Sequence, residues 1–196
     1  MKSFLDKLFR RLRLGKIIRY IPNDSVVCDI GCGREAIFLK SISSFIKQGI
    51  GLDGKIEDYT DSKFEFRRFK IIDSLPIEKE KCDIVTMVAF LEHLDKPQLI
   101  LGESFRILKK GGKLILTTPT PLAKSILEFL SFKLRLIDEN EIRDHKNYFW
   151  PKDIQKMLEE NGFEGKNIKS NYFEFFLNGL VVAKKWSRQP IDEYTF

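Results

Sequence analysis

Short apolar runs alternate with segments of helical period along most of the chain, and this alternation predicts an α/β protein with a mostly parallel sheet. Strands are predicted over residues 26–30, 48–53, 64–72, 83–89, 113–118, 168–176 and 180–186. Helices are predicted over residues 4–12, 36–46, 95–110, 122–137 and 152–161. The last two strands flank Asn178-Gly179, a typical hairpin turn, so they are expected to pair antiparallel.

One stretch, Val26–Ala36, organises the rest of the chain. Its apolar start predicts a buried strand, and Gly31 and Gly33 predict a sharp turn into the helix that follows. A glycine turn leaves room for a ligand against the main chain, and the helix directs its free N–H groups toward that ligand. We therefore expect a small ligand here, one that is partly negative or accepts hydrogen bonds.

Two families use such a turn. Gly31-x-Gly33-x-x-Ala36 fits the dinucleotide fingerprint and Asp53 lies near the place of a ribose-binding acid, so an NADH-binding dehydrogenase is one alternative. Further motifs, in their order along the chain, resemble those of the class I S-adenosylmethionine-dependent methyltransferases. They are Asp29-x-Gly31-x-Gly33, Gly51-Leu52-Asp53, Asp73-Ser74-Leu75-Pro76, Cys82-Asp83-Ile84-Val85, Leu91-Glu92-His93-Leu94 and the run 106–114. The resemblance covers residues 25–196, and it departs from the family at Glu35, where a glycine or small residue is usual.

The resemblance implies a three-layer, Rossmann-like fold with a mostly parallel seven-stranded sheet that ends in an antiparallel hairpin. It also implies S-adenosylmethionine as the cofactor, and no metal. Asp53 is expected to bind the ribose hydroxyls and Asp73 the adenine amino group, while Asp29 accepts from the turn's backbone and orients the ligand's ammonium end. The implied cofactor-binding residues are Asp29, Gly31, Cys32, Gly33, Asp53, Gly54, Asp73, Ser74, Val88 and Ala89.

Methyl transfer from a sulfonium is an in-line displacement, so an enzyme has to hold the acceptor and take a proton from it. His93 follows the fourth strand and is the candidate base; the alternative is that it caps or packs at the start of a helix. His145, beside the aromatic run 148–150, is the second catalytic candidate and would orient the acceptor. Glu92 and Asp95 are interpreted as surface or cap acids.

Charge is concentrated at one end of the chain. The net charge is +6, and the first 20 residues alone carry seven basic side chains against Asp6, so the remainder is close to neutral. Nucleic acid is therefore not an expected partner. Residues 1–22 are expected to contain an amphipathic basic helix. It either covers the cofactor site or a sheet edge, or contacts an anionic membrane peripherally through residues 1–20, which would suit a lipid-linked acceptor.

The length fits one domain over residues 23–196, in which 118–150 form a substrate-covering insertion or a helix simply docked on the sheet. Three cysteines without metal-ligand spacing favour a reducing, cytoplasmic location. The end of the chain, with Asn161-Gly162-Phe163, resembles small-molecule and glycan methyltransferases, among them the ubiquinone-pathway O-methyltransferases.

The expected function is methyl transfer to oxygen or nitrogen of a small-molecule, glycan or lipid-linked acceptor. The alternatives are an RNA methyltransferase, or a catalytically degenerate partner protein in which Glu35 narrows the cofactor pocket.

Overall fold

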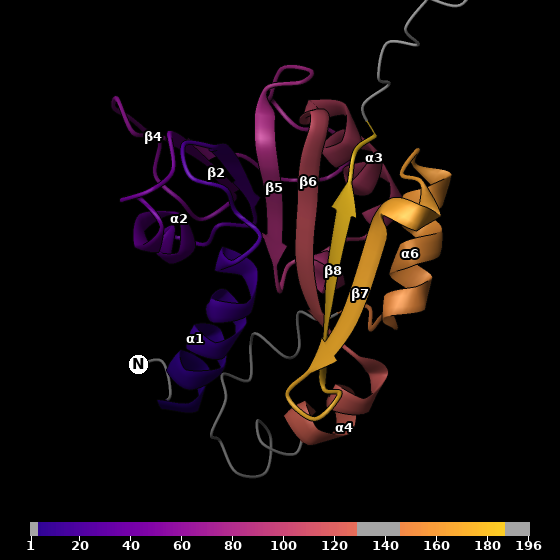
Figure 1. The fold of residues 1–196 in the computed structure, drawn as a ribbon. Coiled ribbons are helices and arrows are strands. Elements are labelled where there is room, and N and C mark those ends of the chain that lie inside the picture. The colour runs from indigo at the N-terminus through magenta and orange to yellow at the C-terminus, as the bar shows by residue number, and fades with distance from the viewer. Residues whose placement is uncertain (1–3, 129–145, 187–196) are drawn as a thin grey trace, which may run out of the picture.

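The computed structural model describes residues 4–128 and 146–186, which form an α/β fold around one eight-stranded sheet (Figure 1). The strand order is β3-β4-β2-β1-β5-β6-β8-β7. The strands are β1 Val26–Ile30, β2 Gln48–Asp53, β3 Tyr59–Thr60, β4 Phe64–Arg68, β5 Cys82–Val88, β6 Leu108–Pro119, β7 Ile168–Phe173 and β8 Asn178–Lys184.

The pairing directions confirm a parallel sheet that ends in an antiparallel hairpin. Strands β4, β2, β1, β5 and β6 pair in parallel, whereas β8 lies antiparallel to β6, and β7 antiparallel to β8. The sequence predicted seven strands, and the eighth is β3, a two-residue edge strand antiparallel to β4. Such a short, exposed strand carries no apolar alternation that a sequence pattern can register.

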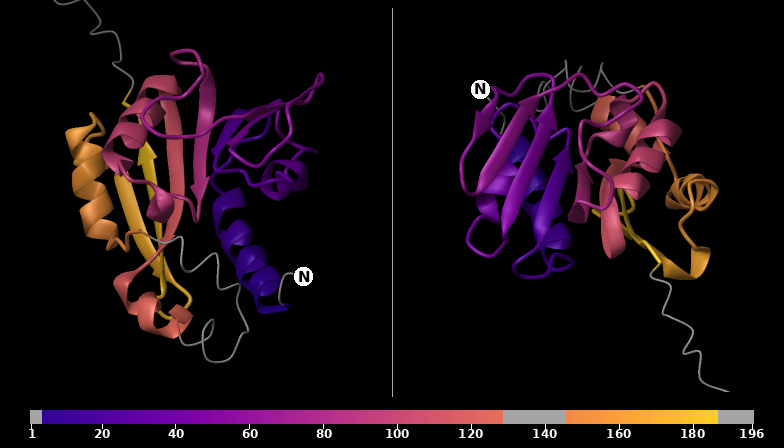
Figure 2. Two further views of the ribbon diagram at one scale, coloured as in Figure 1. Left: turned by 180° about the vertical axis from the view of Figure 1, so that it is seen from behind. Right: turned by 90° about the horizontal axis from the view of Figure 1, so that it is seen from above.

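Helices cover both faces of the sheet and complete the three layers (Figure 2). They are α1 Phe4–Ile18, α2 Ile37–Ser41, α3 Pro97–Ile107, α4 Pro121–Glu128 and α6 Pro151–Glu160, with 3-10 turns η1 Leu91–His93 and η3 Gly165–Asn167. Ile17 of α1 and Leu39 of α2 are buried in one apolar cluster, and Ile100 of α3 and Ile154 of α6 in the other. Burying an aliphatic side chain of this size stabilises the fold by roughly 1.5–3 kcal/mol.

The bounds of β4 and β6 differ most from those that the sequence predicted. Strand β4 ends at Arg68 rather than at residue 72, because Arg68 pairs with Asp53, the last residue of its partner β2. The Phe69 N–H still donates to the Asp53 carbonyl over 3.0 Å, and β2 offers no residue beyond Asp53. Strand β6 begins at Leu108, before the paired glycines that were expected to precede it; Gly111 has a φ of 81° within this strand.

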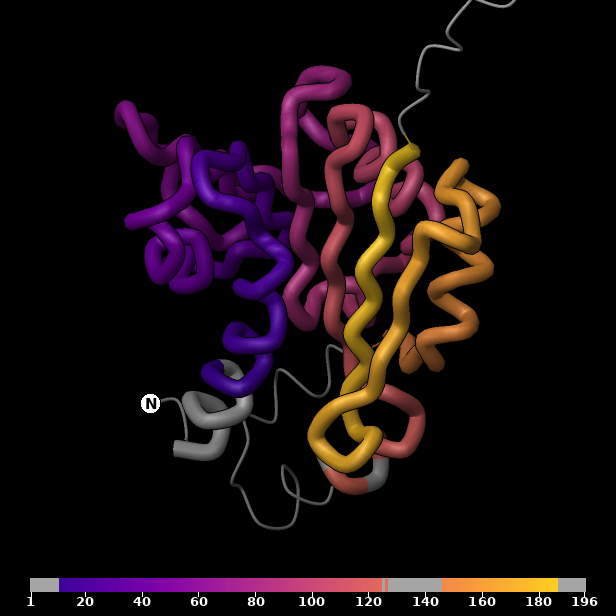
Figure 3. Tube along the Cα trace, in the orientation of Figure 1, coloured from indigo at the N-terminus to yellow at the C-terminus, as the bar shows by residue number. Residues whose placement is uncertain are grey.

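The hairpin turn lies elsewhere than predicted. Asn178 and Gly179 belong to β8, where they pair with Phe173 and Tyr172, and residues 174–177 form the turn at the lower end of the hairpin in Figure 3. Gly179 serves packing instead: a Cβ there would lie 3.0 Å from the Pro151 ring. The glycine that favoured a two-residue turn therefore stands where β8 lies close to the Pro151 ring.

Three predicted helices also differ in length. Helix α1 extends to Ile18, whereas α2 ends at Ser41, five residues short of its predicted end. The helix predicted over 122–137 is present as α4 up to Glu128, and the rest of that prediction, like much of the proposed 118–150 insertion, lies outside the described residues. Within residues 4–128 and 146–186, no helix has the length and apolar content that crossing a membrane requires.

Candidate functional site

The glycine turn closes the carboxyl end of β1 against β2. The N–H groups of Gly31 and Cys32 both donate to the carbonyl of Leu52, at 2.8 and 3.2 Å. Gly31 and Gly33 have φ values of 78° and 71°, in the left-handed region that glycine tolerates best. A Cβ on Gly31 would lie 2.1 Å from the Phe90 ring, so the ring packs directly on the backbone of the turn.

Asp53 locks the end of β2 to this turn. Its Oδ2 accepts a 2.9 Å hydrogen bond from the Gly33 N–H, and its Oδ1 accepts a 2.7 Å bond from the Lys55 N–H. The two predicted site elements, glycine turn and acid, are therefore brought together. Each carboxylate oxygen has a second lone pair, so a half-buried Asp53 retains two acceptor positions that match adjacent hydroxyls of a ribose.

Asp29 is buried beneath the turn, and Thr86 on the neighbouring strand β5 donates to its Oδ1 over 2.6 Å. The expected donors were backbone groups of the turn, and the structure supplies a hydroxyl instead. Burial raises the pKa of Asp29 to about 7, the Thr86 hydroxyl opposes that rise, and the charge of Asp53 adds to it. A cation placed beside Asp29 would favour its ionised form, which suits the ammonium end of an amino-acid ligand.

Three more of the predicted residues lie around the same edge. Burial raises the pKa of the Cys32 thiol well above its ordinary value, so this thiol stays protonated. Val88 ends β5, and Ala89, with a φ of 51°, donates its N–H to Thr117 over 3.0 Å. A Cβ on Gly54 would meet nothing within 4 Å, which leaves open space beside Asp53.

Asp73 and Ser74 are exposed in the loop after β4, where the Ser74 hydroxyl donates to Asp73 over 3.3 Å. The next residue is anchored, because Leu75 donates its N–H to the carboxylate of Glu103 on α3 over 2.8 Å. The adenine-binding role of this pair stays a prediction.

The first turn of α2 differs from the sequence prediction. Glu35 is exposed, which corresponds to the reading in which its side chain points away from the pocket. Ala36 is left-handed, with a φ of 45°, and α2 has only five residues. A helix dipole of that length contributes little at the turn, so the charges of Asp29 and Asp53 have more weight in the site than the sequence suggested.

Of the two catalytic candidates, His93 and His145, only His93 lies within the described residues. His93 lies half-buried in η1, with its ring 6.4 Å from the Phe90 ring and thus beside the glycine turn. His145 lies outside the described residues. Asp95 is an exposed acid that pairs with Lys146 over 2.6 Å, as interpreted, but Glu92 is fully buried, so its interpretation as a surface acid was wrong.

Sequence reasoning missed Thr86, and it missed that the Phe90 ring packs on Gly31, although it placed Phe90 across from the glycine turn. A hydroxyl residue inside the apolar run of β5 was a usable signal for Thr86, since a buried hydroxyl needs a polar partner. Nothing in the sequence indicates that the Phe90 ring covers Gly31.

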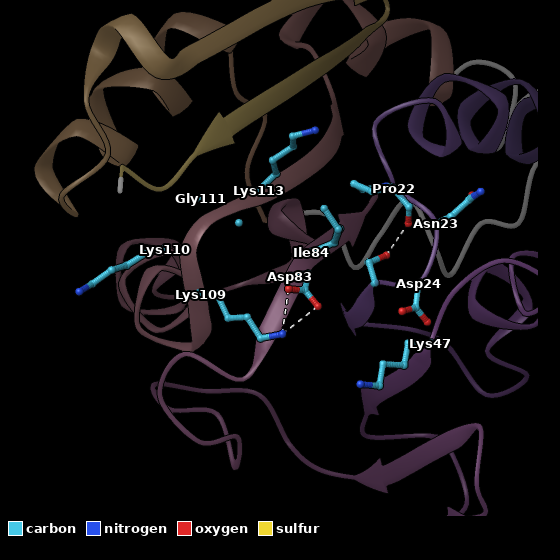
Figure 4. A pocket seen from close by; sticks show the side chains of 12 residues that line it. Pro22, Asn23, Asp24, Lys47, Asp83, Ile84, Lys109, Lys110, Gly111 and Lys113 are labelled. Carbon is cyan, nitrogen blue, oxygen red and sulfur yellow. Dashed lines mark hydrogen bonds and ion pairs between the residues drawn. The ribbon is translucent and has the colours of Figure 1, made fainter. Parts of the chain in front are cut away.

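A hollow of about 440 Å³ lies at the other end of the parallel strands (Figure 4). Residues 22–25, which precede β1, line it together with Asp83 and Lys109, and these last two form an ion pair at 2.8 Å. Ligands of open parallel sheets bind outside the carboxyl ends of the strands. This hollow is therefore separate from the glycine-turn site.

The comparisons with known proteins identify the family. A family model described as a methyltransferase domain matches residues 1–167. The chain belongs to this methyltransferase family. It is 26% identical over 180 residues to a ubiquinone biosynthesis O-methyltransferase of Psychrobacter arcticus, an alignment that covers 85% of this chain and 67% of that protein. It is 27% identical over 174 residues to an uncharacterized protein of Methanocaldococcus jannaschii, covering 84% and 76%.

Solved structures agree on the fold. An S-adenosylmethionine-dependent methyltransferase from Archaeoglobus fulgidus has a TM-score of 0.65 at 21% identity, covering 90% of this chain and 94% of that one. A chain from the complex of the Haloferax volcanii Trm112 methyltransferase activator with a methyltransferase has a TM-score of 0.68 at 16% identity, covering 91% and 89%. The methyltransferase is therefore of class I and an enzyme, and its family implies S-adenosylmethionine as methyl donor. This outcome removes the dehydrogenase alternative.

Proposed function

We propose that this methyltransferase transfers the methyl group of S-adenosylmethionine to an oxygen or nitrogen of a small-molecule, glycan or lipid-linked acceptor. The observation that carries the proposal is the joining of the glycine turn to Asp53 through the Gly33 N–H at the carboxyl edge of the sheet. The names of several relatives, ubiquinone biosynthesis O-methyltransferases, support oxygen as the atom methylated.

The residues of the site fit this cofactor. Asp53 has acceptor positions for two ribose hydroxyls beside open space at Gly54, and Asp29 is a buried acid whose ionised form gains from a neighbouring cation. Asp73 and the backbone of Ser74 would hold the adenine. The bound cofactor supplies an electrophilic methyl group on a sulfonium, and the chain then has to orient the acceptor and receive its proton. His93, beside Phe90, remains the predicted base among the histidines.

The acceptor class is inferred from the 118–150 insertion and the N-terminal helix. We propose a single domain over residues 23–196 in which residues 118–150 cover the acceptor, and peripheral membrane contact through residues 1–20. Leu12 on α1 is 47% exposed, which supports contact with an apolar surface, but Ile17 is buried against the sheet, so the second half of α1 belongs to the protein body. Liposome sedimentation with and without residues 1–20 tests this point, and equal partitioning would remove the membrane contact.

A reducing, cytoplasmic location belongs to the same proposal. Cys28, Cys32 and Cys82 are free thiols in the structure, and this supports a compartment in which thiols stay reduced.

The test of the proposed function is label transfer. The purified chain is incubated with methyl-labelled S-adenosylmethionine and a cell extract, and the labelled products are separated. Wild-type protein is expected to label a small molecule, glycan or lipid. Asp53→Ala is expected to label nothing, whereas Glu57→Gln, which changes an exposed acid just after β2, should behave as wild type. Absence of label with folded wild-type protein would contradict the proposal.

A further inference from the structure

Buried polar atoms without a hydrogen-bond partner gather in one part of the described structure. In residues 4–128 and 146–186, five buried side-chain atoms lack a partner, and they belong to four residues. They are Nε of Arg13, both carboxyl oxygens of Glu92, Oγ1 of Thr118 and Oε1 of Glu174. Such atoms are rare in folded proteins, because each forfeits the hydrogen bonds that it made to water.

These four residues come from four segments of the chain that meet at the carboxyl edge. Arg13 lies on α1, Glu92 in η1 after β5, Thr118 near the end of β6, and Glu174 in the turn between β7 and β8. In Figure 1, α1 and this turn both lie in the lower half of the molecule, below the end of β5. The β7–β8 turn is tied to β6, because Thr120 donates its hydroxyl to the Phe176 carbonyl over 2.8 Å.

Strand pairing places Thr118 beside Gly179, and the neighbouring Asn178 donates to the Glu174 carboxylate. The influence of charges links Glu92 and Arg13 to the same group. Burial raises the pKa of Glu92, and its backbone, the charges of His93 and Arg13, and the Thr118 hydroxyl oppose the rise. Burial also raises the pKa of Glu174, again against the influence of Arg13. The Arg13 guanidinium therefore lies near both carboxyl groups. Yet none of the five atoms forms a bond of hydrogen-bond geometry, although Oε2 of Glu174 does accept from Asn178.

The cluster adjoins the cofactor site. Glu92 is two residues from Phe90, whose ring packs on Gly31 of the glycine turn. Thr118 follows Thr117, which accepts a hydrogen bond from the Ala89 N–H. A group bound between Arg13, Glu92 and Glu174 is thus next to the place where a methyl donor would lie.

We propose that Arg13, Glu92, Thr118 and Glu174 form the binding site for the hydroxyl groups of a neutral methyl acceptor, and that Glu92, in place of the sequence-predicted His93, receives the proton of the reacting hydroxyl. This inference rests on the proposed methyl transfer. Hydroxyl groups of the acceptor can donate to the carboxyl groups of Glu92 and Glu174 and accept from Arg13. They therefore satisfy both the acceptors and the donor of the cluster. An anionic acceptor would instead add a third negative charge beside two buried acids, which is unfavourable even with Arg13 and His93 nearby.

The proton step balances as follows. The acceptor O–H gives its proton to a carboxylate oxygen of Glu92 while the oxygen lone pair attacks the methyl carbon. The carbon–sulfur bond breaks, and its electron pair stays on sulfur. The products are a methyl ether, the neutral thioether of the demethylated cofactor and a protonated Glu92, which then loses its proton to solvent.

The cluster is closed in this structure, because the five atoms have no contact with solvent. Through Arg13, the N-terminal helix α1 is part of this acceptor site.

Label transfer with Glu92→Gln tests the catalytic role independently of the cofactor site. The variant is expected to bind S-adenosylmethionine as wild type does in calorimetry, to unfold at no lower denaturant concentration, and to lose methyl transfer by about 100-fold or more. Asp95→Asn, which changes an exposed acid three residues on, should leave all three quantities unchanged. If Glu92 is only structural, the variant will lose stability and cofactor affinity together.

Arg13→Gln tests the place of α1 in the site. Because Arg13 binds the acceptor but takes no proton, the concentration of extract fraction needed for half-maximal labelling is expected to rise several-fold, while the maximal rate falls less. Arg11→Gln, which changes an exposed neighbour on the same helix, is the control. An unchanged concentration dependence in Arg13→Gln would remove Arg13 from the site.

The labelled product identifies the acceptor chemistry. An ether resists mild alkali and releases methyl iodide with hydriodic acid, whereas a methyl ester releases methanol in mild alkali. Coelution of the label with a sugar derivative or with a ring that absorbs ultraviolet light distinguishes a sugar hydroxyl from an aromatic one. An ester product, or full transfer by Glu92→Gln, overturns the inference and leaves the methyltransferase function intact; no transfer by wild type overturns both.

Discussion

The carboxylate of Asp53 accepts the N–H of Gly33 at 2.9 Å, so an acid at the end of β2 holds the glycine turn at the end of β1. The two residues are 20 positions apart in the chain and belong to neighbouring parallel strands. This link turns two separate motifs into one site. It also means that a change at Asp53 affects the shape of the turn as well as the acceptor atoms offered to a ribose.

The two turn glycines are expected to differ in their sensitivity to alanine. Gly33→Ala introduces a left-handed alanine, which costs roughly 1–2 kcal/mol, but its Cβ meets nothing within 4 Å. Gly31→Ala has the same backbone strain, and its Cβ would also lie 2.1 Å from the Phe90 ring. Urea denaturation should therefore show a larger loss of stability for Gly31→Ala. Equal losses in the two variants would mean that the Phe90 ring does not pack on the turn.

Asp29 is expected to make stability depend on pH. Its pKa is about 7 in the fold against 3.8 ordinarily, so the folded protein keeps a proton that the unfolded chain releases. Between about pH 4 and pH 7 the free energy of unfolding therefore falls as pH rises, by a few kcal/mol at most, and the fall ends above pH 7. Chemical denaturation across this range should show a smaller decline in Asp29→Asn. An identical decline in both proteins would assign the effect to other groups.

Thr86→Val is expected to enlarge the same effect. The substitution removes the Thr86 hydroxyl, which donates to Asp29 and holds the pKa of that acid down, and it keeps a β-branched side chain in β5. The pKa of Asp29 is therefore expected to rise further. The loss of a hydrogen bond to a buried acid should destabilise the protein by roughly 1–3 kcal/mol near neutral pH. The variant should be nearest to wild type at low pH, where Asp29 is protonated in both states. A deficit that stays constant with pH would point to packing rather than to Asp29.

Gly179→Ala tests why glycine stands in the middle of β8. Its φ lies outside the left-handed region, so a loss of stability would come from the Pro151 ring, 3.0 Å from the added Cβ. Gly15→Ala in α1 is the control, because a Cβ there meets nothing within 4 Å and alanine favours a helix by about 1 kcal/mol. Thermal unfolding should rank Gly179→Ala below wild type and Gly15→Ala level with it or above. The reverse ranking would contradict the packing explanation.

The sequence predicted the parts of the fold that have strong local signals. Strands β1 and β2 have the predicted bounds, because apolar runs end there at a glycine turn and at an acid. The hairpin was predicted to turn at Asn178-Gly179 because that dipeptide favours turns, yet both residues pair within β8 and residues 174–177 form the turn. Bounds that depend on a partner strand, such as the end of β4, cannot be found from one segment alone.

The residues of the candidate site also fall into those with a local sequence signal and those that depend on tertiary packing. Gly31, Gly33 and Asp53 could be predicted, because their chemistry follows from their own type and position. Glu92 could not, because an acid after the fourth predicted strand suggested a surface or cap residue, and only tertiary packing buries its side chain. Arg13 could not be predicted as a site residue for the same reason, since the two acids that its charge influences, Glu92 and Glu174, are far away in the sequence.

The central claim is that the glycine turn and Asp53 together bind S-adenosylmethionine. Calorimetric titration of wild type, Asp53→Ala and Glu57→Gln with this cofactor tests it most directly. We predict binding of one molecule per chain to wild type and to Glu57→Gln, and a loss of at least tenfold in affinity in an Asp53→Ala variant that remains folded. Folded wild-type protein that binds no S-adenosylmethionine, or an Asp53→Ala variant that binds it as well as wild type, would contradict the account.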